Sequence, residues 1–225
     1  MTDRSQETVA TWQDDYFARA WAARDSMRDM LSFPRQIAAV VVAEDNPGVD
    51  LIVDIGSGPG DFLAVFLAEF PAARGLWTDV SLTMRELAVE RLGEFAGRVE
   101  FQAADMTDLH AIPGGAGLIS SSRATHHLDR EGLLDFYAQA AAHLAPGGWL
   151  VNLDHTGLPD AWDARLRSAR KRFRAAPESG TSHHHNYPLP SGQDHLDGYA
   201  AAGITDVYVA WQAFHTSLFI GRREK

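Results

Sequence analysis

Residues 49–70 read VDLIVDIGSGPGDFLAVFLAEF, an apolar run, a glycine-rich loop and a second apolar run. The first run is short, continuous and closed by glycine, which is typical of a strand buried on both faces. The second run predicts a helix that begins at Asp61 and stops before Pro71. Glycines in the loop permit positive φ and let a ligand approach the backbone closely. This strand, loop and helix therefore predict a ligand site at the carboxyl end of a sheet strand.

Strand-like and helix-like segments continue to alternate after this stretch. Strands are expected at 74–80, 98–105, 117–123 and 148–155, and helices at 82–95 and 130–144. Two further apolar segments, 205–211 and 214–222, have so short a connection that they should pair as an antiparallel hairpin. The pattern predicts an α/β fold: a Rossmann-like, doubly wound, seven-stranded and mostly parallel sheet, with helices on both faces and an antiparallel C-terminal hairpin.

The two ends of the chain differ from this core. Residues 8–43 have helical spacing, interrupted by an expected break at 32–34, and predict an N-terminal helical cap. Towards the C-terminus, 160–175 and a segment capped by Ser191 should be helical. We expect one domain over 1–225, in three parts: a helical cap (1–45), a ligand-binding core (46–155) and a substrate-side loop, helices and hairpin (156–225).

Composition limits the possible partners. The chain has 225 residues, 20 Lys and Arg, 30 Asp and Glu and no cysteine, with a formal net charge of −10. An acidic surface is a poor match for a phosphate backbone, so nucleic acid is not expected as the substrate. Thiolate chemistry and cysteine zinc sites are excluded. The polar N-terminus and the lack of a long apolar run favour a cytoplasmic protein without a membrane span.

The glycine loop has the spacing G-x-G-x-G, which differs from the dinucleotide fingerprint G-x-G-x-x-G. Asp61 stands where the third dinucleotide glycine would be, and its charge would repel a pyrophosphate. The Lys-Ser/Thr pair of a phosphate-binding Walker loop is also missing after the loop. The loop favours a ligand without phosphate that brings a cationic or zwitterionic group close to the backbone.

Several spaced motifs together resemble the class I S-adenosylmethionine-dependent methyltransferases. They are LIVDIGSGPG (51–60), LWTDVS (76–81), QAADM (102–106), ISSSRATHHL (119–128) and LAPGGWLVNLD (144–154). The resemblance is clear over roughly residues 49–155 and implies S-adenosylmethionine as cofactor, with S-adenosylhomocysteine as the product. The glycine loop alone would be a weak signal, but acidic residues at the next two strand ends make it specific.

The resemblance assigns cofactor roles by position. Asp79 would accept hydrogen bonds from the ribose hydroxyls, and charge would strengthen both bonds. Asp105 would accept from the adenine amino group, with Met106 packed near the ring. As alternatives, Asp79 would cap the following helix and Asp105 would be a turn residue. The expected cofactor-binding residues are Asp54, Gly56, Ser57, Gly58, Gly60, Asp79, Val80, Asp105, Met106 and Ser121.

Histidines and acidic residues follow the fourth and fifth strands. His126 and His127 come after the fourth, and Asp154 and His155 end the fifth. His127, Asp154 and His155 are candidates for a base or for positioning the acceptor, with local backbone bonding as the alternative for each. Arg123 is a candidate for binding a carboxylate, because its planar guanidinium matches that group.

The N-terminal helix carries aromatic and basic residues. Tyr16, Trp21 and Arg24 are candidates for a lid that shields the acceptor from water. The alternative for the aromatic side chains is an apolar stripe that packs on the core, and this alternative is favoured. The basic run at 165–174 is expected to be a solvated helix face.

Residues 182–190, SHHHNYPLP, contain three consecutive histidines. His183, His184 and His185 are candidates for a catalytic base or an acceptor contact, and Tyr187 for acceptor binding, because loops on a rigid scaffold commonly carry function. Adjacent histidines on an extended chain point to opposite faces and lack a metal-ligand spacing, so no metal site is assigned.

The sequence therefore predicts methyl transfer from S-adenosylmethionine to a small molecule by in-line displacement. Positioning supplies much of the rate in such a reaction, so no single base is obligatory. A tRNA-modifying methyltransferase and a non-catalytic cofactor-binding regulator are the alternatives. A nicotinamide oxidoreductase is the weakest rival. The acceptor is not identified, and the oligomeric state is open, with a homodimer as one option.

Overall fold

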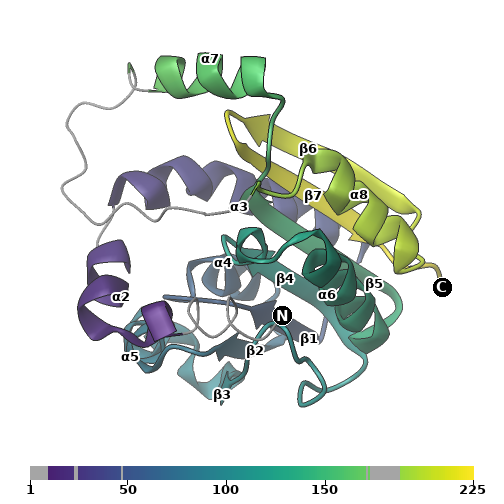
Figure 1. The fold of residues 1–225 in the computed structure, drawn as a ribbon. Coiled ribbons are helices and arrows are strands. Elements are labelled where there is room, and N and C mark those ends of the chain that lie inside the picture. Colours follow the sequence, from purple (N-terminus) through teal and green to yellow (C-terminus); the bar gives the residue numbers. More distant parts are fainter. Residues whose placement is uncertain (1–9, 23–24, 47, 171, 173–187) are drawn as a thin grey trace.

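The computed structural model places a seven-stranded sheet between helices (Figure 1). It describes residues 10–22, 25–46, 48–170, 172 and 188–225. The strands are β1 (Leu51–Ile55), β2 (Arg74–Asp79), β3 (Val99–Ala103), β4 (Ala116–Ser122), β5 (Leu144–His155), β6 (Asp206–Ala213) and β7 (Thr216–Arg222). The helices are α2 (Asp15–Ala22), α3 (Asp25–Asp45), α4 (Asp61–Glu69), α5 (Leu82–Arg91), α6 (Arg130–His143), α7 (Asp160–Arg170) and α8 (Gly192–Ala201), with 3-10 turns η1 (Gly93–Arg98) and η2 (Thr125–His127).

The strand order is β3-β2-β1-β4-β5-β7-β6. β1 pairs in parallel with β2 on one side and β4 on the other, so the chain reverses its winding direction at β1. Ligands bind at such a switch point, outside the carboxyl ends of the strands. β7 is antiparallel to both β5 and β6, so the other six strands share one direction. The predicted sheet and its C-terminal hairpin are confirmed.

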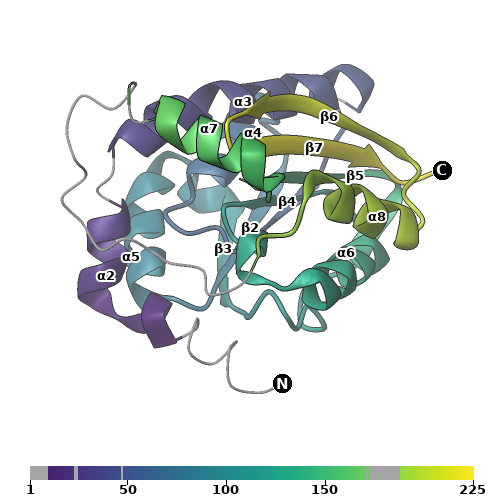
Figure 2. The same ribbon diagram turned by 45° about the horizontal axis from the view of Figure 1, so that its top comes forward.

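Two apolar layers cover the sheet, as Figures 1 and 2 show. On one face, α3 and α4 pack with α2 and α5 around Phe62, Phe66 and Trp77. On the other face, α6 and α8 pack around Phe136 and Tyr199. Helices on both faces were predicted from the alternating pattern, and the structure confirms them. Among the described helices, none combines the length and apolarity that crossing a bilayer requires.

The predicted helix break at 32–34 is wrong, because α3 continues through Pro34. Proline has no N–H, so it removes one helical hydrogen bond and commonly kinks or ends a helix. Here the flanking residues Leu31, Ala38 and Val42 are all buried in the core. Their burial favours the continuous helix and offsets the lost bond.

Two helices, α5 and α8, begin at a serine N-cap. Ser81 accepts a hydrogen bond from the Met84 N–H at the start of α5. Ser191 and Asp194 form a reciprocal capping box at the start of α8. Both serines satisfy backbone donors that a helix start leaves without partners.

The other end of α4 is closed by an arginine from η1. The Arg98 guanidinium donates to the carbonyl oxygens of Leu67, Phe70 and Ala73, at 3.0, 3.0 and 2.8 Å. A cation at a helix C-terminus also complements the helix dipole. Arg98 therefore fixes α4, whose N-terminus follows the glycine loop.

We predict that Arg98→Met lowers the free energy of unfolding by about 2 kcal/mol, because three carbonyl oxygens lose a charged donor. Urea denaturation measures this loss. Arg85→Met on the exposed face of α5 is the control, with an expected change within about 0.5 kcal/mol. Equal effects of the two substitutions would contradict the capping role.

Candidate functional site

The glycine loop after β1 is held by the end of β2. The Gly58 N–H donates to the Asp79 carboxylate at 2.9 Å, and the Trp77 indole N–H donates to the Gly58 carbonyl at 2.8 Å. The Ser57 N–H donates to the Thr78 carbonyl at 2.9 Å. Both backbone groups of Gly58 are thus occupied by β2, which fixes the loop before any ligand arrives.

Three glycines in this loop have positive φ, at 61° for Gly56, 53° for Gly58 and 84° for Gly60. A Cβ on Gly56 would lie 2.6 Å from the Cβ of Ala124, and one on Gly60 would lie 2.8 Å from Leu92. A Cβ on Gly58 would meet nothing within 4 Å. Gly56 and Gly60 are therefore required for packing, whereas Gly58 faces open space where a ligand can approach.

Asp54 lies under the loop and is fully buried. Its carboxylate accepts from the hydroxyls of Ser57 and Ser120, the latter at 2.7 Å. Burial raises the pKa of Asp54 to about 6, although these two bonds and the charge of Arg35 act in the opposite direction. Asp54 does not line the pocket described below, so its observed contacts are with the loop and β4.

Asp79 ends β2 at the open side of the loop. One carboxylate oxygen accepts from the Gly58 N–H and the other from the Ser81 N–H, both at 2.9 Å. Burial raises the pKa of Asp79, and the two backbone donors oppose that shift. Each carboxylate oxygen has a further lone pair, so Asp79 can still accept from a pair of hydroxyls.

The carboxyl end of β3 adds Asp105 and Met106 to the same pocket. One oxygen of Asp105 accepts from both the N–H and the hydroxyl of Thr107, each at 2.9 Å. The turn role considered for Asp105 is therefore present. The residue also faces the pocket, so the two roles are compatible.

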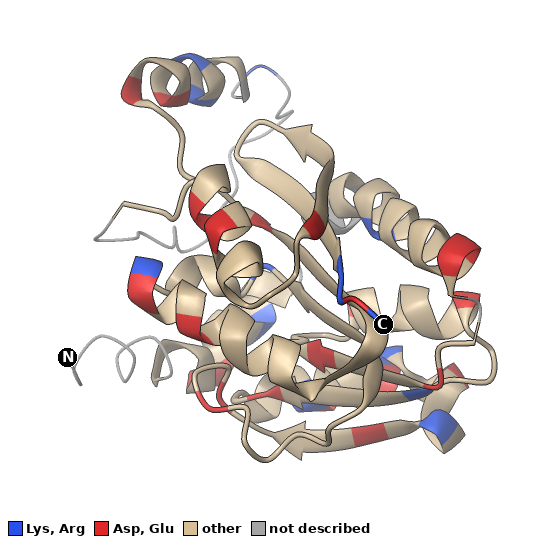
Figure 3. Cartoon of the chain, turned by 90° about the vertical axis from the view of Figure 1, so that its right-hand side faces the viewer, with Lys and Arg blue, Asp and Glu red and all other residues tan. Residues whose placement is uncertain are grey.

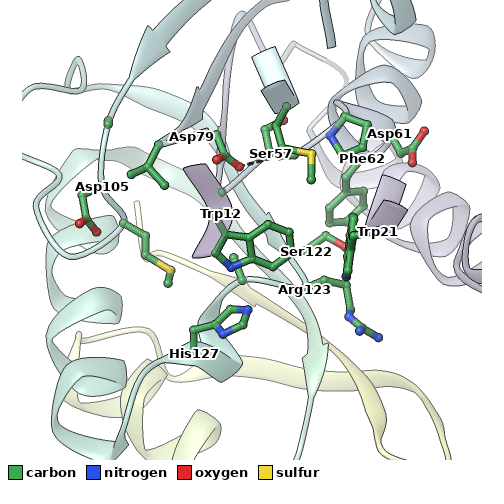
Figure 4. A pocket seen from close by; sticks show the side chains of 18 of the residues that line it. Trp12, Trp21, Ser57, Asp61, Phe62, Asp79, Asp105, Ser122, Arg123 and His127 are labelled. Atoms are coloured by element: carbon green, nitrogen blue, oxygen red, sulfur yellow. Dashed lines mark hydrogen bonds between the residues drawn. The ribbon is translucent and has the colours of Figure 1, made fainter. Parts of the chain in front are cut away.

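One pocket gathers these groups at the carboxyl ends of β1, β2 and β4 (Figure 4). Asp79 and Asp105 lie on one side in this view, with Trp21 and Phe62 on the other and Trp12 between them. The lining residues are Trp12, Trp21, Arg35, Gly56, Ser57, Gly58, Pro59, Asp61, Phe62, Asp79, Val80, Met84, Ala104, Asp105, Met106, Ser122, Arg123, Ala124 and His127.

Asp61 at the start of α4 lies between two arginines. Its carboxylate is 3.0 Å from Arg91 and 3.7 Å from Arg35, and Asp61 and Arg35 both line the pocket. Among the described residues, two arginines thus flank the Asp61 carboxylate. The repulsion of anions that Asp61 alone would cause is therefore compensated.

His127 lines the pocket, and two aromatic neighbours fix its ring. The Trp12 ring packs edge-on against it at 5.7 Å, and the His126 ring lies 4.2 Å away. His126 is buried, and its Nδ1 lies 2.6 Å from an oxygen of Asp154. Of the two adjacent histidines, His127 therefore faces the pocket and His126 lies behind it.

Asp154 is fully buried and serves as an acceptor for its neighbours. It accepts from the Thr125 hydroxyl, from the His126 N–H and ring, and from the His155 N–H. Burial alone would raise its pKa, but His126, His155 and Arg123 hold the pKa well below its usual range. Asp154 is thus an ionised group that orients His126, and it does not line the pocket.

His155 also lies outside the pocket lining. Its Nδ1 is 3.1 Å from the Thr216 hydroxyl and 3.3 Å from the His215 carbonyl. Its ring packs edge-on against His126 at 5.3 Å. These contacts place the ring of His155, the last residue of β5, against the start of β7.

The end of β4 contributes Ser122 and Arg123 to the pocket, whereas the Ser121 hydroxyl donates to the Ile55 carbonyl at 2.9 Å. The Ser122 hydroxyl oxygen is buried and has no hydrogen-bond partner among the described residues. Arg123 has φ of 62°, which is uncommon for a residue with a side chain and marks local strain at the pocket.

The acceptor-side candidates fall into three groups. Trp21 lines the pocket, and Tyr16 is 77% exposed and does not. Trp12 and Trp21 also pack on the core, as the packed-stripe alternative expects, and the lid hypothesis for Trp21 stays a prediction. The remaining candidates lie outside the described residues: Arg24, His183, His184, His185 and Tyr187.

No three His, Asp or Glu side chains come together as metal ligands in the described part of the chain. The basic segment at 165–174 is described as far as the end of α7. There Arg167 pairs with Asp163 at 2.7 Å, and Arg165 lies over the Trp162 ring. Acidic and basic residues share this exposed helix (Figure 3), as expected for a solvated face.

Comparisons with known proteins agree with this geometry. Residues 52–148 match the family model described as a methyltransferase domain. An O-methyltransferase family protein from Burkholderia thailandensis superposes with a TM-score of 0.68 at 25% identity, over 96% of this chain and 64% of that one. Over these residues the chain is similar to the class I S-adenosylmethionine-dependent methyltransferases, as its motifs predicted.

Two further relatives show how far the similarity extends. A 3-amino-4-hydroxybenzoate 4-O-methyltransferase from Streptomyces cremeus is 30% identical over 125 residues, 55% of this chain and 34% of the relative. A putative O-methyltransferase from Nostoc punctiforme has a TM-score of 0.69 at 18% identity, over 94% and 60% of the two chains, and supports the fold. The chain therefore spans about a third of this curated relative and less than two thirds of either solved neighbour.

The sequence did not indicate several residues that line the pocket. Ser122 could have been found from strand alternation, because it and Ser121 must face opposite sides of the sheet. Trp12, Arg35 and Phe62 come from helices, and no local signal indicates which helical face meets the strand ends.

The buried Asp54 predicts a pH dependence of the protein's stability. Its pKa of about 6 in the folded state exceeds the unfolded value of 3.8, so folding favours the protonated form. This contribution is complete below about pH 4 and is lost as the pH rises through 6. The side chain in Asp54→Asn cannot ionise. Between about pH 4.5 and 7.5, the free energy of unfolding of the wild type should therefore fall by on the order of 2 kcal/mol relative to that of the variant. Denaturant titrations of both proteins at the two pH values measure this difference. The same change of stability with pH in both proteins would contradict the raised pKa of Asp54.

Proposed function

We propose that this methyltransferase transfers a methyl group from S-adenosylmethionine to a hydroxyl group of a small aromatic acceptor. The observation that carries the proposal is the fixed loop, with Gly58 facing open space and the Asp79 carboxylate beside it. A carboxylate in this position suits a ribose with two vicinal hydroxyls.

The donor set fits the nucleoside part of the cofactor. Asp79 would accept from both ribose hydroxyls, because each of its oxygens has one backbone donor and a lone pair to spare. Asp105 and Met106 line the next part of the pocket and would meet the adenine. The Asp105 oxygen that is not bonded to Thr107 would accept from the amino group.

The amino-acid end of the cofactor fits the opposite side of the loop. The corner formed by Asp61, Arg35 and Arg91 brings two arginines to the N-terminus of α4. Arg35 lines the pocket there and would bind the carboxylate of the methionine part. The adjacent Ser122 hydroxyl, buried and without a described partner, is available for a polar group of the ligand.

The acceptor site would lie between the aromatic residues and His127. Trp12, Trp21 and Phe62 give the pocket a flat apolar wall that suits a planar ring. The Streptomyces cremeus relative is named for a hydroxybenzoate, and this name supports a phenolic acceptor here. Arg123 lines the same pocket and would favour an acceptor with an anionic substituent.

The reaction needs alignment and removal of one proton. When bound, S-adenosylmethionine would supply an electrophilic methyl group for the acceptor oxygen, with sulfur keeping the electron pair of the carbon–sulfur bond that is lost. His127 would take the hydroxyl proton, since it is the histidine that lines the pocket. Trp12 and Trp21 would exclude water and hold the acceptor, which lowers the entropic cost of alignment.

Cofactor binding tests the proposal first. Calorimetry with the wild type should show binding of S-adenosylmethionine and S-adenosylhomocysteine and none of NAD. Asp79→Ala should weaken the binding of S-adenosylhomocysteine by at least about tenfold, because the ribose hydroxyls lose a charged acceptor. Asp108→Ala, on the exposed loop beyond the pocket, is the control. Binding of NAD instead, or equal affinities in all three proteins, would contradict the proposal.

Methyl transfer is the second test. Labelled S-adenosylmethionine should methylate a member of a panel of hydroxybenzoates, with 3-amino-4-hydroxybenzoate included. His127→Ala should lower turnover about a hundredfold and leave the affinity for S-adenosylhomocysteine unchanged, because it removes a base and no cofactor contact. His155→Ala, outside the pocket lining, should lower turnover much less. Equal turnover of His127→Ala and the wild type would remove the assigned role.

A further inference from the structure

A chain of buried hydrogen bonds leads from Asp154 away from the pocket. The Thr125 hydroxyl donates to Asp154 at 2.7 Å, and the Asn152 amide nitrogen lies 2.9 Å from both the Thr125 and the Tyr137 hydroxyl oxygens. The Tyr137 hydroxyl in turn lies 2.7 Å from Nδ1 of His195. All five side chains are fully buried.

The charge of Asp154 fixes the direction of every bond in this chain. An ionised carboxylate only accepts, so Thr125 must donate to it and must itself accept from Asn152. The second amide hydrogen of Asn152 points to the Tyr137 oxygen, which leaves the Tyr137 O–H to donate to His195. His195 is then protonated on Nε2 alone, in keeping with its pKa, which burial lowers to about 4.

The chain connects elements that meet only in the folded protein. Asn152 and Asp154 are two residues apart on β5 and so share one face of the sheet. Tyr137 comes from α6 and His195 from α8, which pack side by side over that face (Figure 1). Hydrogen bonds through the Asn152 side chain therefore link these two helices to the site.

Two polar atoms of the chain have no hydrogen-bond partner among the described residues, Oδ1 of Asn152 and Nε2 of His195. Burying such atoms costs free energy, and an apolar core of the same shape would avoid this cost. A buried network that is only partly satisfied therefore requires an explanation other than stability.

We propose that Asn152, Tyr137 and His195 are positioning residues for the base. They hold Thr125 against Asp154; Asp154 fixes the His126 ring, and that ring packs on His127 at the pocket. This inference rests on the proposed function, because the base role of His127 gives the positioning its purpose. The geometric part, from His195 to His126, can be tested without an acceptor.

Two neighbouring tyrosines provide a matched test. Tyr137 and Tyr199 are both fully buried, with ring centroids 4.5 Å apart. The Tyr199 hydroxyl donates to the Leu150 carbonyl at 3.0 Å and also interacts with the Tyr137 hydroxyl, but it does not lie on the path from His195 to Asp154. Tyr137→Phe and Tyr199→Phe therefore each remove one buried hydroxyl from the same cluster, and only the first opens the chain.

The signal to measure is the proton resonance of the His126 ring N–H that is shared with Asp154, together with the nitrogen shifts of that imidazole. Tyr137→Phe should shift or broaden this resonance, and Tyr199→Phe should change it much less, because only Tyr137 contacts both Asn152 and His195. Calorimetry should give the wild-type affinity for S-adenosylhomocysteine in both variants, because neither residue lines the pocket. An unchanged resonance in Tyr137→Phe, or equal changes in both variants, would overturn the proposal.

A second pair keeps the test decisive if Tyr137→Phe does not fold. His195→Asn retains an acceptor for the Tyr137 hydroxyl and should preserve the His126 resonance. His195→Leu removes that acceptor and should change the resonance, and identical spectra of these two variants would overturn the proposal. If the wild type fails to bind S-adenosylhomocysteine, the proposed function fails, while the resonance still reports on the buried chain.

Discussion

The structure of the site depends on the hydrogen bond between the Gly58 N–H and the Asp79 carboxylate. It joins the loop after β1 to the end of β2 and fixes the loop at the point where the winding of the sheet reverses. The Trp77 indole fixes the other backbone group of Gly58, so the loop cannot turn without breaking two bonds. Because glycine alone combines positive φ with open space above its Cα, the ligand side of the loop stays accessible.

Burial and partners separate the roles of three aspartates. Asp54 is buried beneath the loop with a raised pKa, and its bonds to Ser57 and Ser120 organise the backbone. Asp79 is half-buried and keeps acceptor capacity towards the pocket. Asp154 is buried among four donors and remains ionised, so it can orient His126 but cannot reach a ligand. The same carboxyl group thus serves loop structure, the proposed ligand binding and the orientation of a neighbour.

The sequence predicts most of the fold because its signals are local. Each buried strand is a continuous apolar run, and the short link between β6 and β7 dictates a hairpin. The predicted break at 32–34 failed because tertiary burial of Leu31 and Ala38 outweighs the effect of Pro34. Strand-end residues such as Asp79 and Asp105 could be placed in the site, since parallel strands end at one edge of the sheet. Arg35 and Tyr137 could not, because which helical face meets the strand ends or β5 is decided only by packing.

A crystal structure of the protein with S-adenosylhomocysteine tests the central claim most directly, namely that the fixed loop and Asp79 form the cofactor site. We predict both ribose hydroxyls within hydrogen-bond distance of the Asp79 carboxylate, the adenine beside Met106, and the Gly58–Asp79 bond retained. A ligand bound with its ribose away from Asp79, or a loop that releases Asp79 on binding, would contradict the account.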